Sequence, residues 1–194
     1  MWDRWKNLSP FLLTPSLDSS SFGKTNPNWE LIKKIAAERR TTMIIKEIKN
    51  DVEKREITRL ILESLTDWFG IPEAREEYIS DSKETPFFCA FADKRPVGFL
   101  YLKETGKDTV ELAVMGVLKE YHRRGIGREL FEEAKKAACV QGYSFLQVKT
   151  VQMGKYKEYD DTNNFYLSLG FKEFEVFPTL WDEWNPCQVY VMGL

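Results

Sequence analysis

Three strand-like segments follow one another with very little chain between them, and this succession constrains the fold more than any other feature of the sequence. The segments are residues 87–92, 96–104 and 109–117, joined only by residues 93–95 and 105–108. Connections of that length join antiparallel neighbours in a β-hairpin. The sequence therefore predicts an antiparallel three-stranded meander in the middle of the chain.

Further strand and helix patterns lie on both sides of the meander. Asn50 is a candidate helix N-cap, with Glu53 three residues later as its capping-box partner. The apolar face of that helix reaches Trp68, and Gly70-Ile71-Pro72 carries the signals of a helix end. The other expected elements are strand 43–48, helix 73–82, helix 125–141, strand 143–151, helix 160–169, and strands 171–177 and 189–192.

This order, βαα-βββ-α-β-α-ββ, predicts an α+β fold, an α/β sandwich with helices flanking a mixed, mostly antiparallel central sheet. The first 42 residues differ from the rest in charge. They carry seven basic and four acidic residues (+3), against 21 and 26 (−5) in residues 43–194. A helical pattern over residues 28–40 follows a loop-like stretch. We expect an N-terminal arm with one helix at 1–42 and one folded domain at 43–194.

Trp2, Trp5 and Phe11 are the conspicuous side chains of the expected arm. Exposed aromatic side chains are unfavourable unless a partner covers them. We expect these three to pack on the parent domain or on a sister subunit, which would make a homodimer, rather than to bind another kind of partner.

The composition excludes several classes of protein. A net charge of −2 and a pI of about 5.7 do not fit a dedicated nucleic-acid binder. Three cysteines without a CxxC pair, and a single histidine, indicate neither a disulfide framework nor a metal centre. The apolar run at residues 11–13 is too short for a signal peptide, and no stretch is long enough to span a membrane. We expect a soluble, cytoplasmic protein without a membrane partner.

The sharpest local feature is the strand-to-helix connection at residues 117–128, where two glycines and three arginines meet at one helix N-terminus. Free backbone N–H groups and the helix dipole bind anions there, and glycines let the main chain approach phosphate oxygens. Leu130 stands where a dinucleotide fingerprint would place glycine, and Arg128-Glu129 where a Walker loop would place Lys-Ser/Thr. The alternative is that the glycines only permit a tight turn.

Residues 117–128 resemble the acetyl-CoA-binding motif of the GCN5-related N-acetyltransferases (GNAT), Gln/Arg-x-x-Gly-x-Gly/Ala. Residues 159–171 resemble the second signature of that family, a short helix ending in Phe-Tyr-x-x-x-Gly-Phe. The resemblance covers residues 43–194 and departs from the family pattern at His122 and Tyr159, where Gln or Arg and Asn are usual. The change at Tyr159 puts the pantetheine contacts of that helix in question.

The resemblance implies the acyl-CoA N-acyltransferase fold, with acetyl-CoA as co-substrate and no metal. It also implies that an amine attacks the thioester directly. The residues that it assigns to the cofactor are Met115, Gly116 and Val117, whose main-chain groups would bind the pantetheine and polarise the thioester, and His122, Arg123, Arg124, Gly125, Ile126, Gly127 and Arg128 around the pyrophosphate.

Glu111 and Tyr166 are the candidate catalytic residues. An amine is almost wholly protonated at neutral pH, so a base, directly or through water, must remove its proton. Strict alternation along strand 109–117 places Glu111 on the same face as Met115, and Gly116 within the strand suggests a bulge or a close backbone approach. The alternative is that Glu111 points to water, and that water alone serves as base.

Tyr166 matches the tyrosine with which the family protonates the departing thiolate. Because a thiol is more acidic than a phenol, hydrogen bonding to the thiolate is the larger role that we expect for it. The alternative is an aromatic side chain that only packs the short helix onto the sheet.

The acceptor should meet the first two helices and the aromatic, acidic segment at residues 177–184, which would suit a small cationic amine. Polyamines, aminoglycosides, amino acids and protein amines all remain open. A rival hypothesis is a non-catalytic acyl-CoA-binding or protein-interaction module on the same fold, which a loss of Glu111 and Tyr166 would have favoured.

Overall fold

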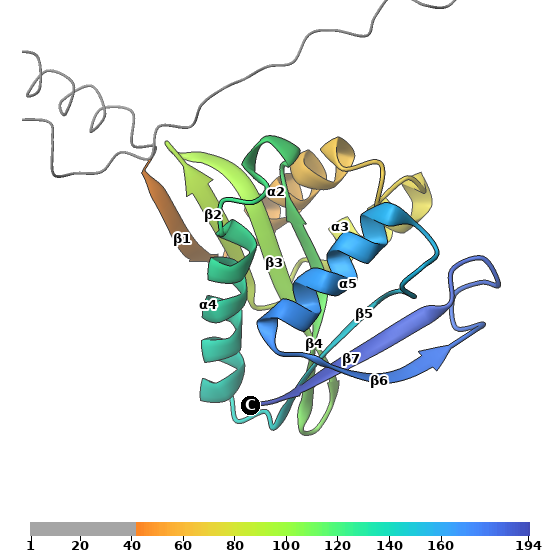
Figure 1. The fold of residues 1–194 in the computed structure, drawn as a ribbon. Helices are drawn as coiled ribbons and strands as arrows, with labels where there is room; N and C mark the ends of the chain where they lie inside the picture. Colours follow the sequence, from red (N-terminus) through yellow and green to blue (C-terminus); the bar gives the residue numbers. More distant parts are fainter. Residues whose placement is uncertain (1–41) are drawn as a thin grey trace, which may run out of the picture. The chain divides into compact units, whose positions relative to one another are not determined.

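A computed structural model describes residues 42–194, and the helix expected within the N-terminal arm lies outside the described residues. Within that described part of the chain, no helix is long and apolar enough to cross a membrane. The order of elements is the predicted one, with one added 3-10 turn (Figure 1). The elements are β1 Met43–Ile48, α2 Asp51–Ser64, α3 Pro72–Asp81, β2 Phe87–Ala92, β3 Arg95–Gly106, β4 Thr109–Val117, η1 Lys119–Tyr121, α4 Ile126–Val140, β5 Phe145–Val151, α5 Lys157–Leu169, β6 Lys172–Phe177 and β7 Cys187–Gly193.

Seven strands form one sheet in the order β1-β2-β3-β4-β5-β7-β6. Neighbouring strands are antiparallel except β4 and β5, which run parallel. Helix α2 covers one face, where a Cβ added at Gly116 of β4 would meet Ile61 and Leu65. Helix α4 covers the other face, where Leu130 lies close to Gly98 of β3. The predicted α/β sandwich around a mixed, mostly antiparallel sheet is confirmed.

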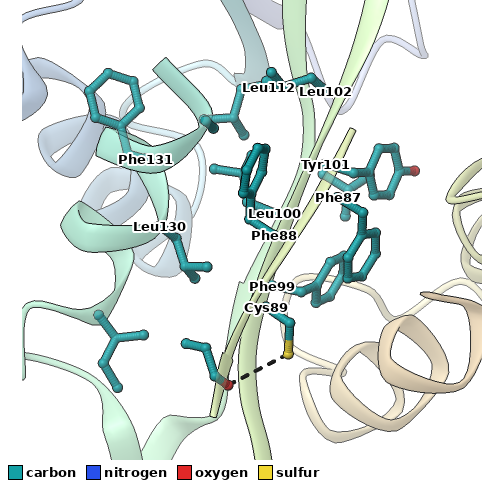
Figure 2. Close-up of a cluster of buried hydrophobic side chains, with 14 of the residues drawn as sticks. Phe87, Phe88, Cys89, Phe99, Leu100, Tyr101, Leu102, Leu112, Leu130 and Phe131 are labelled. Atoms are coloured by element: carbon teal, nitrogen blue, oxygen red, sulfur yellow. Dashed lines mark hydrogen bonds between the residues drawn. The ribbon is translucent and has the colours of Figure 1, made fainter. Parts of the chain in front are cut away.

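Apolar side chains cover both faces of β2 and β3 (Figure 2). On the α2 side the rings of Phe87, Phe99 and Tyr101 are stacked, with 5.3 Å between the first two ring centroids. Phe88 and Leu100 lie on the α4 side (Figure 2). All five side chains are buried. Because both faces are packed, these strands form a rigid base beside which β4 is held.

Strands β4 and β5 are paired only where they begin. Residues 109–111 of β4 lie opposite residues 145–147 of β5, although β4 continues to Val117 and β5 to Val151. Strand β5 stays paired with β7 over its whole length. Residues 112–117 of β4, here called the free edge, therefore have backbone groups on the β5 side without a ladder partner. Such groups need another partner, which a ligand can supply.

The pairing of β3 with β4 shifts by one residue in the middle of the strands. Tyr101 lies opposite Val114, but Leu102 lies opposite Leu112, so Ala113 has no opposite residue. This is a β-bulge, and a one-residue shift moves the side chains beyond it to the other face of the strand. Gly116 itself pairs regularly with Phe99, so the bulge lies at Ala113 and not at Gly116, where the sequence suggested a bulge or a close approach.

The bulge places Glu111 on a different face from the predicted one. Glu111 lies opposite Lys103, whose ammonium group binds Asp81 of α3, so Glu111 faces the side of α2 and α3. Met115 lies on the α4 side, because its Cε would be 2.9 Å from a Cβ at Gly127. The predicted alternation, which grouped Glu111 with Met115, is wrong because one extra residue is inserted between them.

Helix α2 begins as predicted but ends earlier. The Oδ1 atom of Asn50 accepts hydrogen bonds from two backbone N–H groups of the first turn, at 2.9 and 3.0 Å. The helix ends at Ser64, whereas the sequence placed its end near Gly70. Residues 65–71, here called the α2–α3 strap, connect the helix to α3.

We expect Gly116→Val to destabilise the fold. The added Cβ would stand 2.9 Å from Cγ2 of Ile61 and 3.1 Å from Cδ1 of Leu65, both of which are buried. Overpacking of this kind costs about 1–3 kcal/mol of unfolding free energy. The matched control is Gly106→Val on β3, where a Cβ meets nothing within 4 Å. Urea unfolding of both variants measures the difference, and equal stability would contradict the close packing of α2 on β4.

Candidate active site

The connection from β4 to α4 turns sharply into the helix. Arg123 has a φ of 60°, and Gly125, the N-cap, has a φ of 84°. Glycine is favoured at such a φ because it has no Cβ. No side chain caps the helix, so the N–H groups of its first turn remain free and carry the positive end of the helix dipole. An anion bound at this position would accept hydrogen bonds from those N–H groups.

Gly127 lies where the first turn of α4 packs most closely on its neighbours. A Cβ at this position would be 2.9 Å from Cε of Met115 and 3.1 Å from Cζ of Phe165. Ile126, one residue earlier, is buried and anchors the turn to the core. Gly127 therefore has a packing role, in addition to the close approach of a phosphate that the sequence suggested.

The three arginines of the β4–α4 connection point in different directions. Arg123 is largely exposed and lies 3.4 Å from the carboxylate of Asp161 on α5. The guanidinium of Arg124 stacks over the ring of Tyr121 at 5.0 Å. Arg128 donates to the carbonyl and hydroxyl of Ser168, at 3.1 and 3.3 Å. Arg123 and Arg124 can therefore reach an anion at the helix start, while Arg128 joins α4 to α5.

His122 belongs to the wall of the site. Its Nε2 atom lies 2.7 Å from the carbonyl oxygen of Val117, which can only accept, so Nε2 carries the proton. Its ring meets that of Trp68 edge to face, with 5.9 Å between the centroids. The imidazole thus fixes the end of β4 to the start of the connection. The structure gives it no contact with either candidate catalytic residue.

Glu111 occupies the point at which β4 and β5 separate. Its Oε2 atom accepts from Nζ of Lys149 at 2.5 Å and from Nε2 of Gln147 at 3.1 Å, both on β5. The side chains of Glu111 and Lys149 are 13% and 29% exposed, so this ion pair is half-buried. The alternative in which Glu111 simply points to water does not hold. The ion pair joins β4 and β5 at the point where their ladder of hydrogen bonds ends.

Tyr166 has a buried ring and a hydroxyl without a partner. The ring packs against those of Phe165, Phe171 and Tyr190. Its hydroxyl makes no hydrogen bond to any residue between 42 and 194. Every fully buried side-chain polar atom in that range has a hydrogen-bond partner, so the Tyr166 hydroxyl oxygen is not fully buried and is accessible to a ligand or to solvent. Burial, then the charges of Tyr159 and Glu111, raise the pKa of Tyr166 well above its ordinary value. The tyrosine can therefore donate a hydrogen bond over a wide pH range.

Trp68 and Lys149 are the site residues that sequence reasoning missed. Trp68 was placed on the apolar face of α2 but belongs to the strap and contacts His122 and Tyr159. Lys149 is the partner of Glu111. Period-two spacing from Gln147 on β5 could have indicated that Lys149 shares its face, but only the register with β4 identifies Glu111 as its partner.

The predicted residues fall along one path. Met115, Gly116 and Val117 form the end of the free edge and lead directly into the β4–α4 connection. Glu111 lies at the opposite end of the free edge. Tyr166 comes from α5, which packs against the start of α4 through Phe165. No hydrogen bond joins the two candidate catalytic residues within the described range, although the charge of Glu111 acts on Tyr166.

The segment between β6 and β7 presents apolar side chains to solvent. Leu180, Trp181 and Trp184 are 52%, 46% and 77% exposed, so Trp184 in particular does not cap the sheet. Asp182 holds the turn by accepting from the backbone N–H groups of Trp184 and Asn185, each at 2.8 Å.

Residues 83–173 match a family described as an acetyltransferase (GNAT) domain. No match was found among curated protein sequences. Among solved structures, the fold is similar to that of a Desulfovibrio desulfuricans protein assigned to the GNAT acetyltransferase family, with a TM-score of 0.69 and 18% identity over 78% of this chain and 99% of that chain.

Two other similar structures differ in their acceptors. A ribosomal-protein-alanine N-acetyltransferase from Brucella melitensis has a TM-score of 0.61 and 15% identity, over 78% of this chain and 99% of that chain. An aminoglycoside 6′-N-acetyltransferase complexed with coenzyme A has a TM-score of 0.59 and 18% identity, over 77% and 96%. At these identities the likeness shows the fold alone, and it confirms the predicted acyl-CoA N-acyltransferase fold.

Proposed function

We propose that this chain, which belongs to the GNAT acetyltransferase family and is an acyltransferase, moves the acetyl group of acetyl-CoA to an amine by direct attack on the thioester. The observation that carries the proposal is the path formed by the uncapped start of α4, the free edge of β4 and the unpartnered hydroxyl of Tyr166. The start of α4 binds an anion, the free edge offers backbone hydrogen bonds, and Glu111 and Tyr166 supply the proton-transfer groups.

The residues present fit acetyl-CoA. The free N–H groups of Gly125, Ile126, Gly127 and Arg128 suit its pyrophosphate, and the exposed guanidinium groups of Arg123 and Arg124 add positive charge. The free edge, including Met115, Gly116 and Val117, suits the amide groups of the pantetheine arm. Bound acetyl-CoA supplies a thioester that an amine can attack.

Glu111 and Tyr166 would serve the two ends of the reaction. Glu111 uses Oε1, which makes no hydrogen bond within residues 42–194, to take a proton from the attacking amine directly or through a water. Tyr166 donates a hydrogen bond from its hydroxyl to the sulfur as it leaves as a thiolate, and burial keeps that hydroxyl protonated. Backbone N–H groups near the Ala113 bulge and at the end of the free edge would polarise the thioester carbonyl.

We take the acceptor to be a small cationic amine. Glu111 attracts the ammonium form, and the exposed tryptophans Trp181 and Trp184 offer aromatic faces to a cation at the β6–β7 connection. All three cysteines of the described chain are free thiols, which fits a reducing, cytoplasmic setting. The catalytic unit in this proposal is the domain at 43–194.

An amine screen tests the proposed function. Full-length protein is mixed with acetyl-CoA and, separately, with a polyamine, an aminoglycoside, free amino acids and a peptide with a free N-terminus. Free thiol release above the rate of hydrolysis with one class establishes transfer and identifies the acceptor class. Thermal stabilisation by acetyl-CoA without release with any amine would favour the rival, non-catalytic acyl-CoA-binding module.

Glu111→Gln is expected to lower kcat by about 100-fold or more, because a general base contributes on that scale. The comparison variant is Lys149→Met, which removes the other half of the same ion pair. We expect it to retain kcat within about tenfold, since the base remains. Steady-state kinetics with the acceptor found in the screen measures both. Equal losses of kcat and of stability in the two variants would mean that Glu111 only holds β4 to β5.

A further inference from the structure

Trp68 is held by α5, on the β5 side of the separation between β4 and β5. Its indole Nε1 donates to the carbonyl of Glu158 at 3.3 Å. The hydroxyl of Tyr159 donates to the carbonyl of Trp68 at 2.8 Å. These two hydrogen bonds run in opposite directions between the strap and the first turn of α5, so together they fix the position of the indole.

The opposite side of the same indole meets the β4–α4 connection. The ring of His122 contacts it edge to face, and the ammonium of Lys119 lies 5.7 Å from its centroid. Lys119 also binds the carboxylate of Asp67, the strap residue before Trp68, at 2.5 Å. His122 and Tyr159, the two positions at which this chain departs from the family motifs, therefore both contact Trp68.

The strap itself is an ordered piece of chain. The N–H groups of Trp68 and Phe69 both donate to the carbonyl of Leu65, at 3.1 and 3.0 Å. Arg75 of α3 donates to the carbonyl of Phe69 at 2.8 Å. The indole is half-buried. Trp68 is thus presented by a fixed turn, and its place does not depend on a mobile loop.

The topology places this contact across the wide end of the β4–β5 separation. The strands are paired up to Glu111 and diverge toward Val117 and Val151. His122 follows the end of β4, and Tyr159 follows the end of β5. Trp68, which contacts both, therefore spans from the β4 side to the β5 side beyond the unpaired ends of the two strands.

We propose that Trp68 is a cofactor-positioning residue, whose indole forms the cover over the pantetheine arm where that arm leaves the β4–α4 connection and enters the gap beside the free edge. This inference rests on the proposed function. The hydroxyl of Tyr159 positions Trp68 from one side and the imidazole of His122 from the other. An apolar cover excludes water from the arm and holds the thioester near Tyr166.

The test compares two ligands on the full-length protein by calorimetry. Acetyl-CoA carries both pyrophosphate and pantetheine, whereas ADP carries only the pyrophosphate half. We expect Trp68→Ala to raise the dissociation constant of acetyl-CoA by about tenfold and that of ADP by less than about twofold. Tyr159→Phe keeps the ring but loses the hydrogen bond to Trp68. It should raise the dissociation constant of acetyl-CoA by about threefold and leave that of ADP unchanged.

Phe174→Ala is the matched control, since Phe174 is a large aromatic residue on β6 with 67% of its surface exposed. It should leave both dissociation constants unchanged. Equal weakening of both ligands by Trp68→Ala would show a merely structural role, and unchanged or tighter acetyl-CoA binding would show that Trp68 is no cover. Either result overturns the inference.

Trp68→Phe is a more conservative variant that keeps the test valid if Trp68→Ala does not fold. It should bind acetyl-CoA with a dissociation constant between those of wild type and Trp68→Ala, and binding as tight as that of wild type in both Trp68→Phe and Tyr159→Phe would overturn the inference. Failure of the unmodified protein to bind acetyl-CoA would instead overturn the proposed function.

Discussion

Gly125→Glu is expected to abolish detectable binding of acetyl-CoA. The residue is the N-cap of α4 with a φ of 84°, and a Cβ there meets nothing within 4 Å, so a glutamate side chain has room beside the free N–H groups of the first turn. A carboxylate about 4 Å from a phosphate charge is repelled by about 4 kcal/mol at an effective dielectric constant of 20. Allowing for solvent screening, we expect at least about a 100-fold rise in the dissociation constant.

Gly125→Ala separates the effect of charge from that of backbone strain. Any L-residue at this φ is strained by about 1–2 kcal/mol, and alanine adds no charge. The alanine variant should therefore lose stability comparable to the glutamate variant but keep most of its acetyl-CoA binding. Calorimetric titration together with thermal unfolding distinguishes the two quantities. If both variants bind acetyl-CoA as well as the unmodified protein, the start of α4 is not the pyrophosphate site.

Tyr166→Phe is expected to lower kcat by about 100-fold while leaving KM for acetyl-CoA nearly unchanged. The hydroxyl makes no hydrogen bond to the described part of the chain, so its removal should not destabilise the fold. The control is Tyr190→Phe, whose hydroxyl donates to Oδ1 of buried Asn163 at 2.6 Å. That variant should lose about 1–3 kcal/mol of stability, because it leaves a buried acceptor unpaired, and keep its kcat. Full kcat in Tyr166→Phe would assign the tyrosine to packing alone.

The pH dependence of kcat gives a second measurement on Tyr166. Burial raises its pKa above the ordinary value of a tyrosine, so the donating, protonated form persists at pH values where a free tyrosine ionises. A hydroxyl with a raised pKa loses its proton only as the pH rises through that higher value. We therefore expect no fall in kcat from this group up to about pH 10. A fall at lower pH that disappears in Tyr166→Phe would contradict the buried environment.

Local patterns in the sequence were sufficient for most of the fold. Short connections predicted the β2–β3–β4 meander, and the bounds of β2 and β4 were correct to the residue. The helix start at Gly125 and the helix end at Gly170 followed from glycines that adopt a positive φ. These features depend on a few neighbouring residues, so they can be recognised without knowing what packs against them.

Features that depend on contacts between distant segments could not be predicted in this way. The bulge at Ala113 arises from the register of β4 against β3, and it moved Glu111 to the other face of the sheet. Lys149 is 38 residues from Glu111, and Trp68 is 91 residues from Tyr159. The end of α2 was misplaced because the apolar residue Trp68 continues the helical spacing, although its contacts are made by the strap.

The most direct test is a titration of the full-length protein with acetyl-CoA in which the backbone amide NMR spectrum is recorded at each addition. The account predicts saturable changes that are largest for the N–H groups of residues 125–128 and for the free edge at residues 112–117, with Trp68 affected next. Saturable changes confined to other surfaces, or none at all, would contradict the proposal that the start of α4 and the separation between β4 and β5 form an acetyl-CoA site.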